Sequence, residues 1–568
     1  MAEIELNEKR QAILQSRGHV LIEGGPGCGK TTIALLKARG VIPQLRLEQH
    51  VLFLSFSRAA VRQVTDRLPG VLTRADRRVI EVRTFHAFFL EVVRSQGQLL
   101  TGAPVRFITP EREAQRRADH DGDWQVEIDR LARQESVFVF ETLAPIAAEL
   151  LERSADVRAL YSARYPLVIV DEFQDTNRDQ WRVIKALSER STIVCLADPD
   201  QRIFDHLPGV DEHRIQDVRT ALEPVSFDLS EDNHRSPGSG LLDYANAVLR
   251  NRPSARPDNV IVKWYRYDNA EALAHWAVVA VQRKLVQETG VPPTIAVLTR
   301  TNLLAARVSE VLAQDRTAPD GGRLAAIDHV LQVDPELTAA AALVVASVLE
   351  WRLLERNQAV AYTLRHLAGY YRTKLGRGTS GARKTITTVQ RAIEAIDAGR
   401  DPVSKTAKVL LERFDRPAEL TGRPVRDWQV ARARLAGSAE LDEINKRVRL
   451  LRVLRATDSL ASALQDAWDG SAGYQRAADV VRIALAEDAV TVARQEPALV
   501  SVMNMHKSKG KEFDAVIIVE GRHQGQLLSD DLSGQEVERR LLRVAITRAR
   551  QLVVFVRPVG AQPLTPQT

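Results

Sequence analysis

The octapeptide GGPGCGKT at residues 24–31 restricts the fold of this chain more than any other feature. Gly24, Gly29, Lys30 and Thr31 form the phosphate-loop pattern, in which backbone N–H groups turn inward around the phosphates of a nucleotide. The apolar run HVLIEG precedes the loop, and the helical pattern TTIALLKARG follows it. A phosphate loop between a buried strand and a helix predicts a parallel α/β sheet, with Lys30 on the phosphates and Thr31 as a ligand of Mg²⁺.

The length of 568 residues exceeds what one hydrophobic core holds, so we expect several folding units. Hydrophobic residues make up 45% and charged residues 27%, and no apolar run reaches the roughly 18 to 20 residues of a membrane span. The polar start MAEIELNEKRQ and the presence of only two cysteines predict a cytoplasmic protein without a signal peptide. A net charge of +6 permits an anionic partner without requiring one.

Alternating strand and helix patterns occur twice along the chain and predict an α/β fold with two parallel-sheet lobes. The runs HVLIEG, HVLFLSFS and VIEVRTF open the first lobe, which resumes at YPLVIVDEFQD, while VIVKWYRY opens the second, which closes with RQLVVFVRP. Mainly helical sequence interrupts each lobe. The expected division is 1–92 and 158–250 for the first lobe, 93–157 for its insertion, 251–314 and 490–560 for the second lobe, 315–489 for its insertion, and 561–568 for a frayed tail.

Two apolar runs end in acidic residues, as expected where parallel strands deliver side chains to the carboxyl edge of a sheet. In VIVDEFQD, Asp171 is placed to hold Mg²⁺ and Glu172 to orient and deprotonate the attacking water, which predicts hydrolysis. The competing interpretation is an exposed acidic turn after an edge strand. In LADPDQRIF, Gln201 can sense a γ-phosphate because its amide both donates and accepts hydrogen bonds.

Two arginines, Arg235 in DNHRSP and Arg548 in ITRAR, complete a hydrolytic set if the two lobes face each other. Guanidinium donors stabilise the charge that develops on a γ-phosphoryl group. Taken alone, either residue is more often a surface or salt-bridged arginine.

The order of these motifs resembles one family, the UvrD/Rep family of superfamily 1 DNA helicases. The resemblance rests on LNEKRQ, GGPGCGKTT, LSFSRAA, RTFHAF, VDEFQDTN, ADPDQRIF, DNHRSP, MNMHKSKGKEF and RRLLRVAITRAR, which occur in the family's order. These motifs cover roughly the first 90 residues, 160–310 and 490–560. The resemblance implies two RecA-like motor lobes, and the two helical insertions match the family only in position and character.

For the ATP site, the resemblance implies catalytic roles for Lys30, Asp171, Glu172, Gln201, Arg235 and Arg548, and metal ligation by Thr31 and Asp171. Gln11 follows LN one place later than in the family, which leaves Arg10 at the expected position. His234 stands where a tyrosine that stacks on adenine is common, and Glu512 is implied to reach the ribose. The full nucleotide-binding set is Gln11, Gly25, Gly27, Cys28, Gly29, Lys30, Thr31, Thr32, His234, Arg235, Glu512 and Arg548.

For the DNA track, the resemblance implies contacts from both lobes, and stacking on aromatic side chains suits a motor that reads any sequence. The segment DQRIFDHLPG lacks the family's stacking aromatic, and His206 stands nearest to its place. Asn504 replaces a usual threonine and Lys511 a usual leucine. The implied contacts are Phe56, Arg58, Thr84, Phe85, His86, His206, Arg300, Asn302, Asn504, His506 and Lys509.

The function predicted from this pattern is a Mg²⁺- and ATP-dependent translocase and helicase on single-stranded DNA and single-strand/duplex junctions. A 3′–5′ direction is implied by the resemblance alone. The alternative is an ATP-gated DNA-binding subunit that regulates a protein partner such as a nuclease in repair or phage defence. A P-loop kinase or transporter ATPase is rejected, because neither needs TRAR or TFH. The preference for DNA over RNA, the pathway and the oligomeric state stay open.

Overall fold

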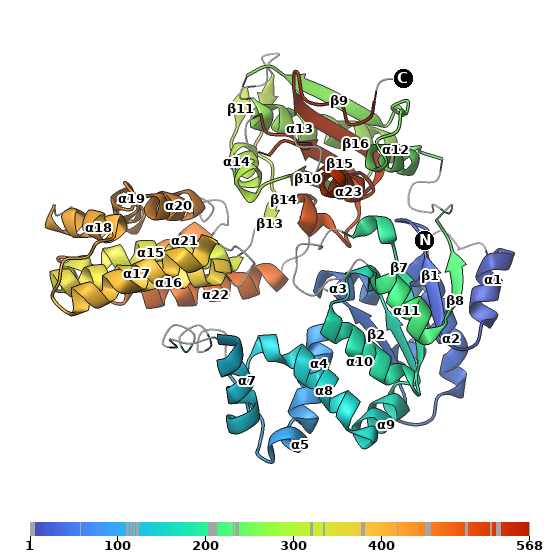
Figure 1. Cartoon of the computed structure of the whole chain (residues 1–568). Coiled ribbons are helices and arrows are strands. Elements are labelled where there is room, and N and C mark those ends of the chain that lie inside the picture. Colours follow the sequence, from blue (N-terminus) through green and yellow to red (C-terminus); the bar gives the residue numbers. More distant parts are fainter. Residues whose placement is uncertain are drawn as a thin grey trace.

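The structure is a computed structural model that contains two α/β lobes and a separate helical body (Figure 1). The lobes lie one above the other in this view, and the helical body projects to one side of them. The residues described are 6–56, 58–108, 113, 116, 120, 124–202, 213–230, 232, 238–267, 269–317, 322–332, 335–375, 381–416, 419–448, 456–494, 498–522, 525–529 and 535–566.

The first lobe is built on a parallel six-stranded sheet with the order β3-β2-β6-β7-β1-β8. Its central strands are apolar and buried on both faces, as expected for a parallel sheet covered by helices. The strands are β1 (Val20–Glu23), β2 (Val51–Ser55), β3 (Ile80–Thr84), β6 (Leu167–Val170), β7 (Thr192–Ala197) and β8 (Val225–Asp228). The helices are α1 (Glu8–Gln15), α2 (Lys30–Val41), α3 (Arg58–Arg67), α4 (Phe85–Gln96), α10 (Arg178–Ser188) and α11 (Arg214–Leu222).

The first insertion contributes less independent structure than the range 93–157 predicts. Ile146 and Leu150 on α8 share one hydrophobic core with Phe88 on α4 and Val183 on α10, so α8 is part of the lobe itself. The segment comprises α5 (Gln98–Thr101), β4 (Arg106–Phe107), α7 (Trp124–Glu135), β5 (Val137–Phe138), α8 (Leu143–Arg153) and α9 (Ala155–Arg164).

The second lobe is also a parallel six-stranded sheet, with the order β13-β14-β10-β15-β16-β9. Together the two sheets confirm the predicted fold class. The strands are β9 (Val260–Tyr265), β10 (Ile295–Thr299), β13 (Val330–Gln332), β14 (Val500–Asn504), β15 (Phe513–Val519) and β16 (Ala549–Pro558). The helices are α12 (Leu241–Leu249), α13 (Ala270–Thr289), α14 (Asn302–Leu312) and α23 (Gln535–Ile546), and a short hairpin joins β11 (Arg316–Thr317) to β12 (Arg323–Leu324).

Three boundaries of the second lobe differ from the expected division. Strand β13 lies inside the range 315–489 but pairs with β14 in the lobe's sheet. Leu241 and Tyr244 on α12, a helix expected in the first lobe, share a core with Leu542 on α23. The expected tail is packed at Leu564, which is buried and whose carbonyl accepts a hydrogen bond from Arg539 Nη1 at 2.8 Å.

The second insertion is the helical body in Figure 1, and it has a hydrophobic core of its own. Leu364 and Tyr370 on α16 are central to this core, which includes Leu410, Leu441 and Tyr474. Within the described residues, every helix is too short or too polar to cross a membrane. The helices are α15 (Pro335–Leu349), α16 (Arg356–Leu375), α17 (Gly381–Asp397), α18 (Lys405–Asp415), α19 (Pro424–Arg434), α20 (Ala439–Val448), α21 (Ala456–Ala467) and α22 (Ala477–Arg494).

Candidate active site

The phosphate loop follows β1 and leads directly into α2, as the sequence predicts. Gly27 and Gly29 have φ angles of 81° and 86°, in the left-handed region that favours glycine. A Cβ atom on Gly24 would lie 2.7 Å from Cys28 Sγ and 3.1 Å from the backbone carbon of Leu229. The loop is therefore shaped by positions that tolerate only a hydrogen as side chain.

Lys30 points back into this loop from the first turn of α2. Its Nζ donates hydrogen bonds to the carbonyl oxygens of Gly24 at 2.5 Å and Gly25 at 3.0 Å. Burial favours the neutral amine, but electrostatic interactions with Cys28, Asp198, Glu172 and Asp171 outweigh burial and raise the pKa of Lys30. An ammonium group held against the phosphate loop suits the binding of a phosphate chain.

Asp171 and Glu172 follow β6 at the carboxyl edge of the same sheet. Glu172 adopts a left-handed backbone conformation, with φ 52° and ψ 40°, which is costly for a residue with a side chain and is typical of functional turns. Burial and the adjacent Glu172 carboxylate raise the pKa of Asp171 to about 7. A divalent cation beside Asp171 would remove this repulsion, so the acidic pair, Lys30 and Thr31 together fit Mg²⁺ bound to a nucleotide triphosphate.

Gln201 connects the first lobe to two side chains of the second lobe. Its Nε2 donates to Asp198 Oδ2 at 2.7 Å, and its side-chain oxygen accepts from Arg548 Nη2 at 3.1 Å. Its backbone carbonyl accepts from Lys509 Nζ at 2.6 Å. The residue predicted to sense a γ-phosphate thus contacts both lobes.

Lys509 lies in surroundings that differ from its predicted place on the DNA. Its ammonium forms an ion pair with the buried carboxylate of Asp175 and lies 3.6 Å from Glu172 Oε2. Burial opposes the charge, but Glu172 and Asp175 outweigh it and raise the pKa of Lys509. Lys509 therefore lies between the lobes, next to Glu172, the predicted catalytic carboxylate, and its DNA contact stays a prediction.

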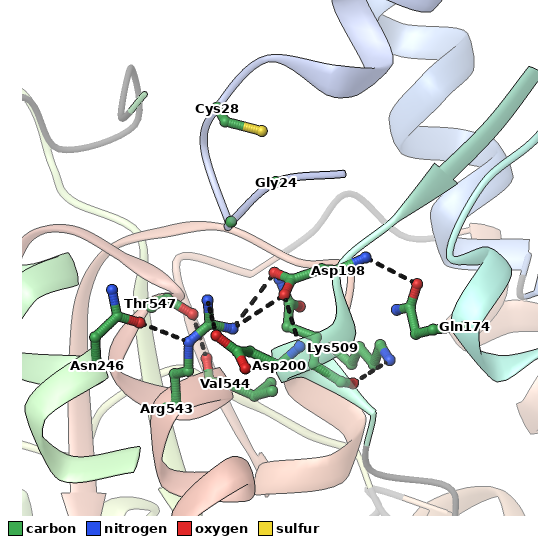
Figure 2. Close-up of polar contacts among 12 residues, drawn as sticks. Gly24, Cys28, Gln174, Asp198, Asp200, Asn246, Lys509, Arg543, Val544 and Thr547 are labelled. Atoms are coloured by element: carbon green, nitrogen blue, oxygen red, sulfur yellow. Dashed lines mark hydrogen bonds and ion pairs between the residues drawn. The ribbon is translucent and has the colours of Figure 1, made fainter. Parts of the chain in front are cut away.

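Arg543 is a residue of the site that the sequence analysis did not single out. Figure 2 shows its guanidinium between Asp198 and Asp200, below the phosphate loop. Its Nε donates to Asn246 Oδ1 at 2.9 Å, and its Nη1 lies 3.4 Å from each carboxylate oxygen of Asp198. The available signal was a charged residue among the buried positions of α23, five residues before Arg548.

Around the expected adenine position, the structure places Arg10 against the phosphate loop and Gln11 away from it. Arg10 is buried, and its Nη2 donates to the Cys28 carbonyl at 3.3 Å and pairs with Asp232. Gln11 is exposed and its Nε2 donates to the Leu6 carbonyl at 3.1 Å. The adenine role of Gln11 stays a prediction, and Arg10 holds the place that the motif's spacing favours.

The remaining nucleotide predictions divide into described and undescribed residues. Glu512 lies between the lobes, where its Oε1 accepts from Arg67 Nη2 at 2.5 Å and Gln63 Nε2 at 3.2 Å. Its role at the ribose stays a prediction. His234 and Arg235, together with His206 of the DNA set, lie outside the described residues.

The predicted DNA contacts of the first lobe gather at the ends of the neighbouring strands β2 and β3. The rings of Phe56 and Phe85 meet edge to face at 5.3 Å, and Thr84 caps α4. His86 stacks on the exposed ring of Phe140 with centroids 4.5 Å apart and planes 7° apart. Phe140, which the sequence analysis did not single out, gives this edge an aromatic surface. Arg58 is the first residue of α3.

The second lobe presents its predicted contacts at the ends of β10 and β14, which are also neighbours. Asn504 Nδ2 donates to Asn302 Oδ1 at 2.7 Å. Arg300 pairs with Glu538 at 2.9 Å, and His506 lies in the short turn Met505–Ser508 after β14. Their DNA contacts stay predictions.

The fold and the site define a class of protein. One parallel lobe supplies a phosphate loop, an acidic pair and Gln201, and the other lobe reaches into this site with two arginines and a lysine. This arrangement is that of a two-lobed, RecA-like P-loop protein with its nucleotide site at the lobe interface.

Comparison with known families agrees with this class. Residues 6–120 and 106–213 match the UvrD/REP helicase N-terminal domain, and residues 499–556 match the UvrD-like helicase C-terminal domain. The chain therefore contains the N-terminal and C-terminal domains of a UvrD-type helicase, in agreement with the motif order.

Individual relatives are distant in sequence. The chain is 24% identical to a putative ATP-dependent DNA helicase, YjcD, of Bacillus subtilis and 23% identical to the ATP-dependent DNA helicase UvrD1 of Mycobacterium bovis, with 98% of the chain aligned to 79% and 83% of these proteins. It is 24% identical to the ATP-dependent DNA helicase PcrA of Leuconostoc citreum, where the match covers 54% of the chain and about half, 48%, of that relative. Among solved structures, the Pif1 helicase from Candida albicans aligns with 48% of the chain at a TM-score of 0.26 and 12% identity.

Proposed function

We propose that this protein is an ATP-dependent DNA helicase that moves along single-stranded DNA in the 3′–5′ direction. The observation that carries the proposal is the contact of Gln201 with Asp198 in its own lobe and with Arg548 and Lys509 of the other. A nucleotide site divided in this way couples the state of the nucleotide to the relative position of the lobes. The relatives named as ATP-dependent DNA helicases support the same activity.

The reaction requires few residues with distinct tasks. When bound, Mg²⁺-ATP supplies the γ-phosphoryl group and the bond to be cleaved. Lys30 holds the phosphates, while Thr31 and Asp171 hold the metal. Glu172 orients the attacking water and takes its proton, and Arg548 stabilises the charge that develops on the transferring group.

Movement along DNA requires that each lobe's grip changes between nucleotide states. The aromatic surface of Phe56, His86 and Phe140 suits stacking of unpaired bases, and Asn302 with Asn504 offers amide donors to the backbone. The proposed substrate is therefore single-stranded DNA and its junctions with duplex, used in the cytoplasm. The 3′–5′ direction rests on the family resemblance.

The test combines steady-state ATP hydrolysis, with and without single-stranded DNA, and strand displacement from 3′-tailed and 5′-tailed duplexes. Glu172→Gln keeps the size of the side chain but removes the base, so we expect hydrolysis to fall by about 10² to 10⁴-fold while nucleotide binding persists. Glu536→Gln, at an exposed site on α23, is the matched control and should behave as wild type. Displacement from the 5′ tail only would contradict the proposed direction.

An ATP-gated subunit that regulates a partner, such as a nuclease, is a second candidate. It is favoured by the small first insertion, whose helix α8 packs into the core of the lobe. This candidate predicts DNA-stimulated hydrolysis without displacement from either tail. Displacement by the purified chain alone would contradict it.

A further inference from the structure

Arg543 reaches the nucleotide site from α23 and is almost fully buried, with 3% of its side chain exposed. Burial of a guanidinium is costly unless anions and hydrogen-bond acceptors surround it. Asn246 Oδ1 accepts from its Nε at 2.9 Å and fixes the inner end of the group. The two outer nitrogens, Nη1 and Nη2, face the first lobe (Figure 2).

The contacts of these outer nitrogens are long. Nη1 lies 3.4 Å from each oxygen of Asp198, and Nη2 lies 3.6 Å from Asp200 Oδ2. Well-formed hydrogen bonds between charged groups measure about 2.7 to 2.9 Å. The guanidinium fork is thus attracted to both carboxylates but makes an optimal pair with neither.

The fork also lies against the phosphate loop. A Cβ atom built on Gly25 would be 3.6 Å from Arg543 Nη2, and Lys30 Nζ is 3.0 Å from the carbonyl of the same glycine. Arg543 and Lys30 therefore flank one stretch of the loop from opposite lobes. Phosphate oxygens that enter this stretch come within reach of both cations.

Asp198 is an anion that interacts with both cations. It is buried, and although burial pushes its pKa upward, the charges of Arg543 and Lys30 outweigh burial and lower it. The same carboxylate accepts from Gln201 Nε2 at 2.7 Å, so it holds the sensing glutamine as well. A phosphate group offers Arg543 a bidentate partner with more negative charge than Asp198.

We propose that Arg543 is a third arginine of the ATP site, held by Asp198 in the nucleotide-free protein and transferred to the terminal phosphate when ATP binds. The transfer gives the protein its preference for triphosphate over diphosphate and draws α23 toward the phosphate loop. It also releases Asp198, and with it Gln201, for the hydrolytic arrangement. This inference rests on the proposed ATP site and does not depend on DNA movement.

The experiment measures the dissociation constants of a non-hydrolysable ATP analogue, AMPPNP, and of ADP with Mg²⁺ and no DNA. Arg543→Gln should weaken AMPPNP binding by about tenfold or more and change ADP binding by less than about threefold, since only the triphosphate reaches the fork. Arg543→Lys should recover part of the loss. Arg540→Gln, on the same helix and paired with Glu536, is the control.

The partner variant separates this exchange from a purely structural ion pair. Asp198→Asn removes the competing anion, so AMPPNP binding should become tighter, the opposite sign to Arg543→Gln. If both variants weaken AMPPNP and ADP alike, the pair is structural and the inference is overturned. Failure of the wild-type protein to bind either nucleotide overturns the inference and the ATP site together, whereas normal triphosphate preference without strand displacement supports the inference and contradicts the motor.

Discussion

At the scale of single residues, the phosphate loop depends on a glycine whose replacement the packing forbids. Gly24→Ala places a methyl group 2.7 Å from Cys28 Sγ and 3.1 Å from the Leu229 backbone, so the loop must shift. We expect nucleotide affinity to fall by at least about tenfold, as measured by titration with a fluorescent ATP analogue. Gly40→Ala in α2 is the matched control, because nothing lies within 4 Å of its new Cβ and alanine favours a helix by up to about 1 kcal/mol. Equal affinity in the two variants would contradict the role of Gly24.

Residue identity predicts this site only where a motif fixes both the side chain and its partner. Lys30 and Asp171 follow from the spacing of glycines and from an apolar run that ends in acids. Arg543 does not, because its partner Asp198 lies in another element and only the fold brings the two together. The sequence alone does not distinguish a buried arginine from the more common surface arginine.

At the scale of elements, the helical body contains a histidine that makes its stability depend on pH. His366 on α16 contacts Tyr362, and its Nε2 is buried with no hydrogen-bond partner among the described residues. Burial is the main cause that lowers the pKa of His366 to about 4. The positive charge of Arg482 lowers this pKa further, and the negative charge of Asp479 partly opposes the shift. The unfolded chain binds this proton near pH 6.5, so the stabilising effect is present above pH 6.5 and is lost as the pH falls toward 4.

The corresponding experiment compares thermal unfolding of the wild-type protein and His366→Gln between pH 8 and pH 4. Carboxylates titrate alike in both proteins, so their effect cancels in the comparison. Below pH 6.5 the unfolding midpoint of the wild-type protein should fall more steeply than that of His366→Gln. The reason is that unfolding of the wild-type protein takes up as much as one additional proton, at His366. Parallel pH profiles would show that His366 has the same pKa in the folded and the unfolded protein, which contradicts the prediction.

The boundaries of elements were predictable only in part. Long apolar strands such as β2 and β15 are recognisable from composition, whereas β13 has three residues and lies within a mainly helical region. Helix α12 was expected in the first lobe because it precedes the second set of strands. Its apolar face, with Leu241 and Tyr244, packs on α23, and chain order carries no information about this choice.

At the scale of the whole molecule, charged side chains connect the two lobes at more than one point. Lys509 of the second lobe pairs with Asp175 of the first, and Glu512 of the second lobe accepts from Arg67 of the first at 2.5 Å. Motif order predicted that the lobes face each other. It did not predict these pairs, because each depends on the angle between two separately folded sheets.

Lys509 provides the last prediction, because its contacts with Asp175 and Glu172 suggest a different task from the DNA contact that the resemblance implies. A phosphate contact predicts that Lys509→Met weakens DNA binding and reduces the salt dependence by about one counterion. The structure places its ammonium on Asp175 and beside Glu172, so we expect the variant to retain DNA affinity and its salt dependence while losing stimulation of ATP hydrolysis by DNA. Fluorescence anisotropy with single-stranded DNA at several salt concentrations, alongside hydrolysis rates, decides between them. Lys284→Met, on the exposed face of α13, is the control. A loss of DNA affinity in Lys509→Met but not in Lys284→Met would contradict this prediction and support a direct contact between Lys509 and DNA.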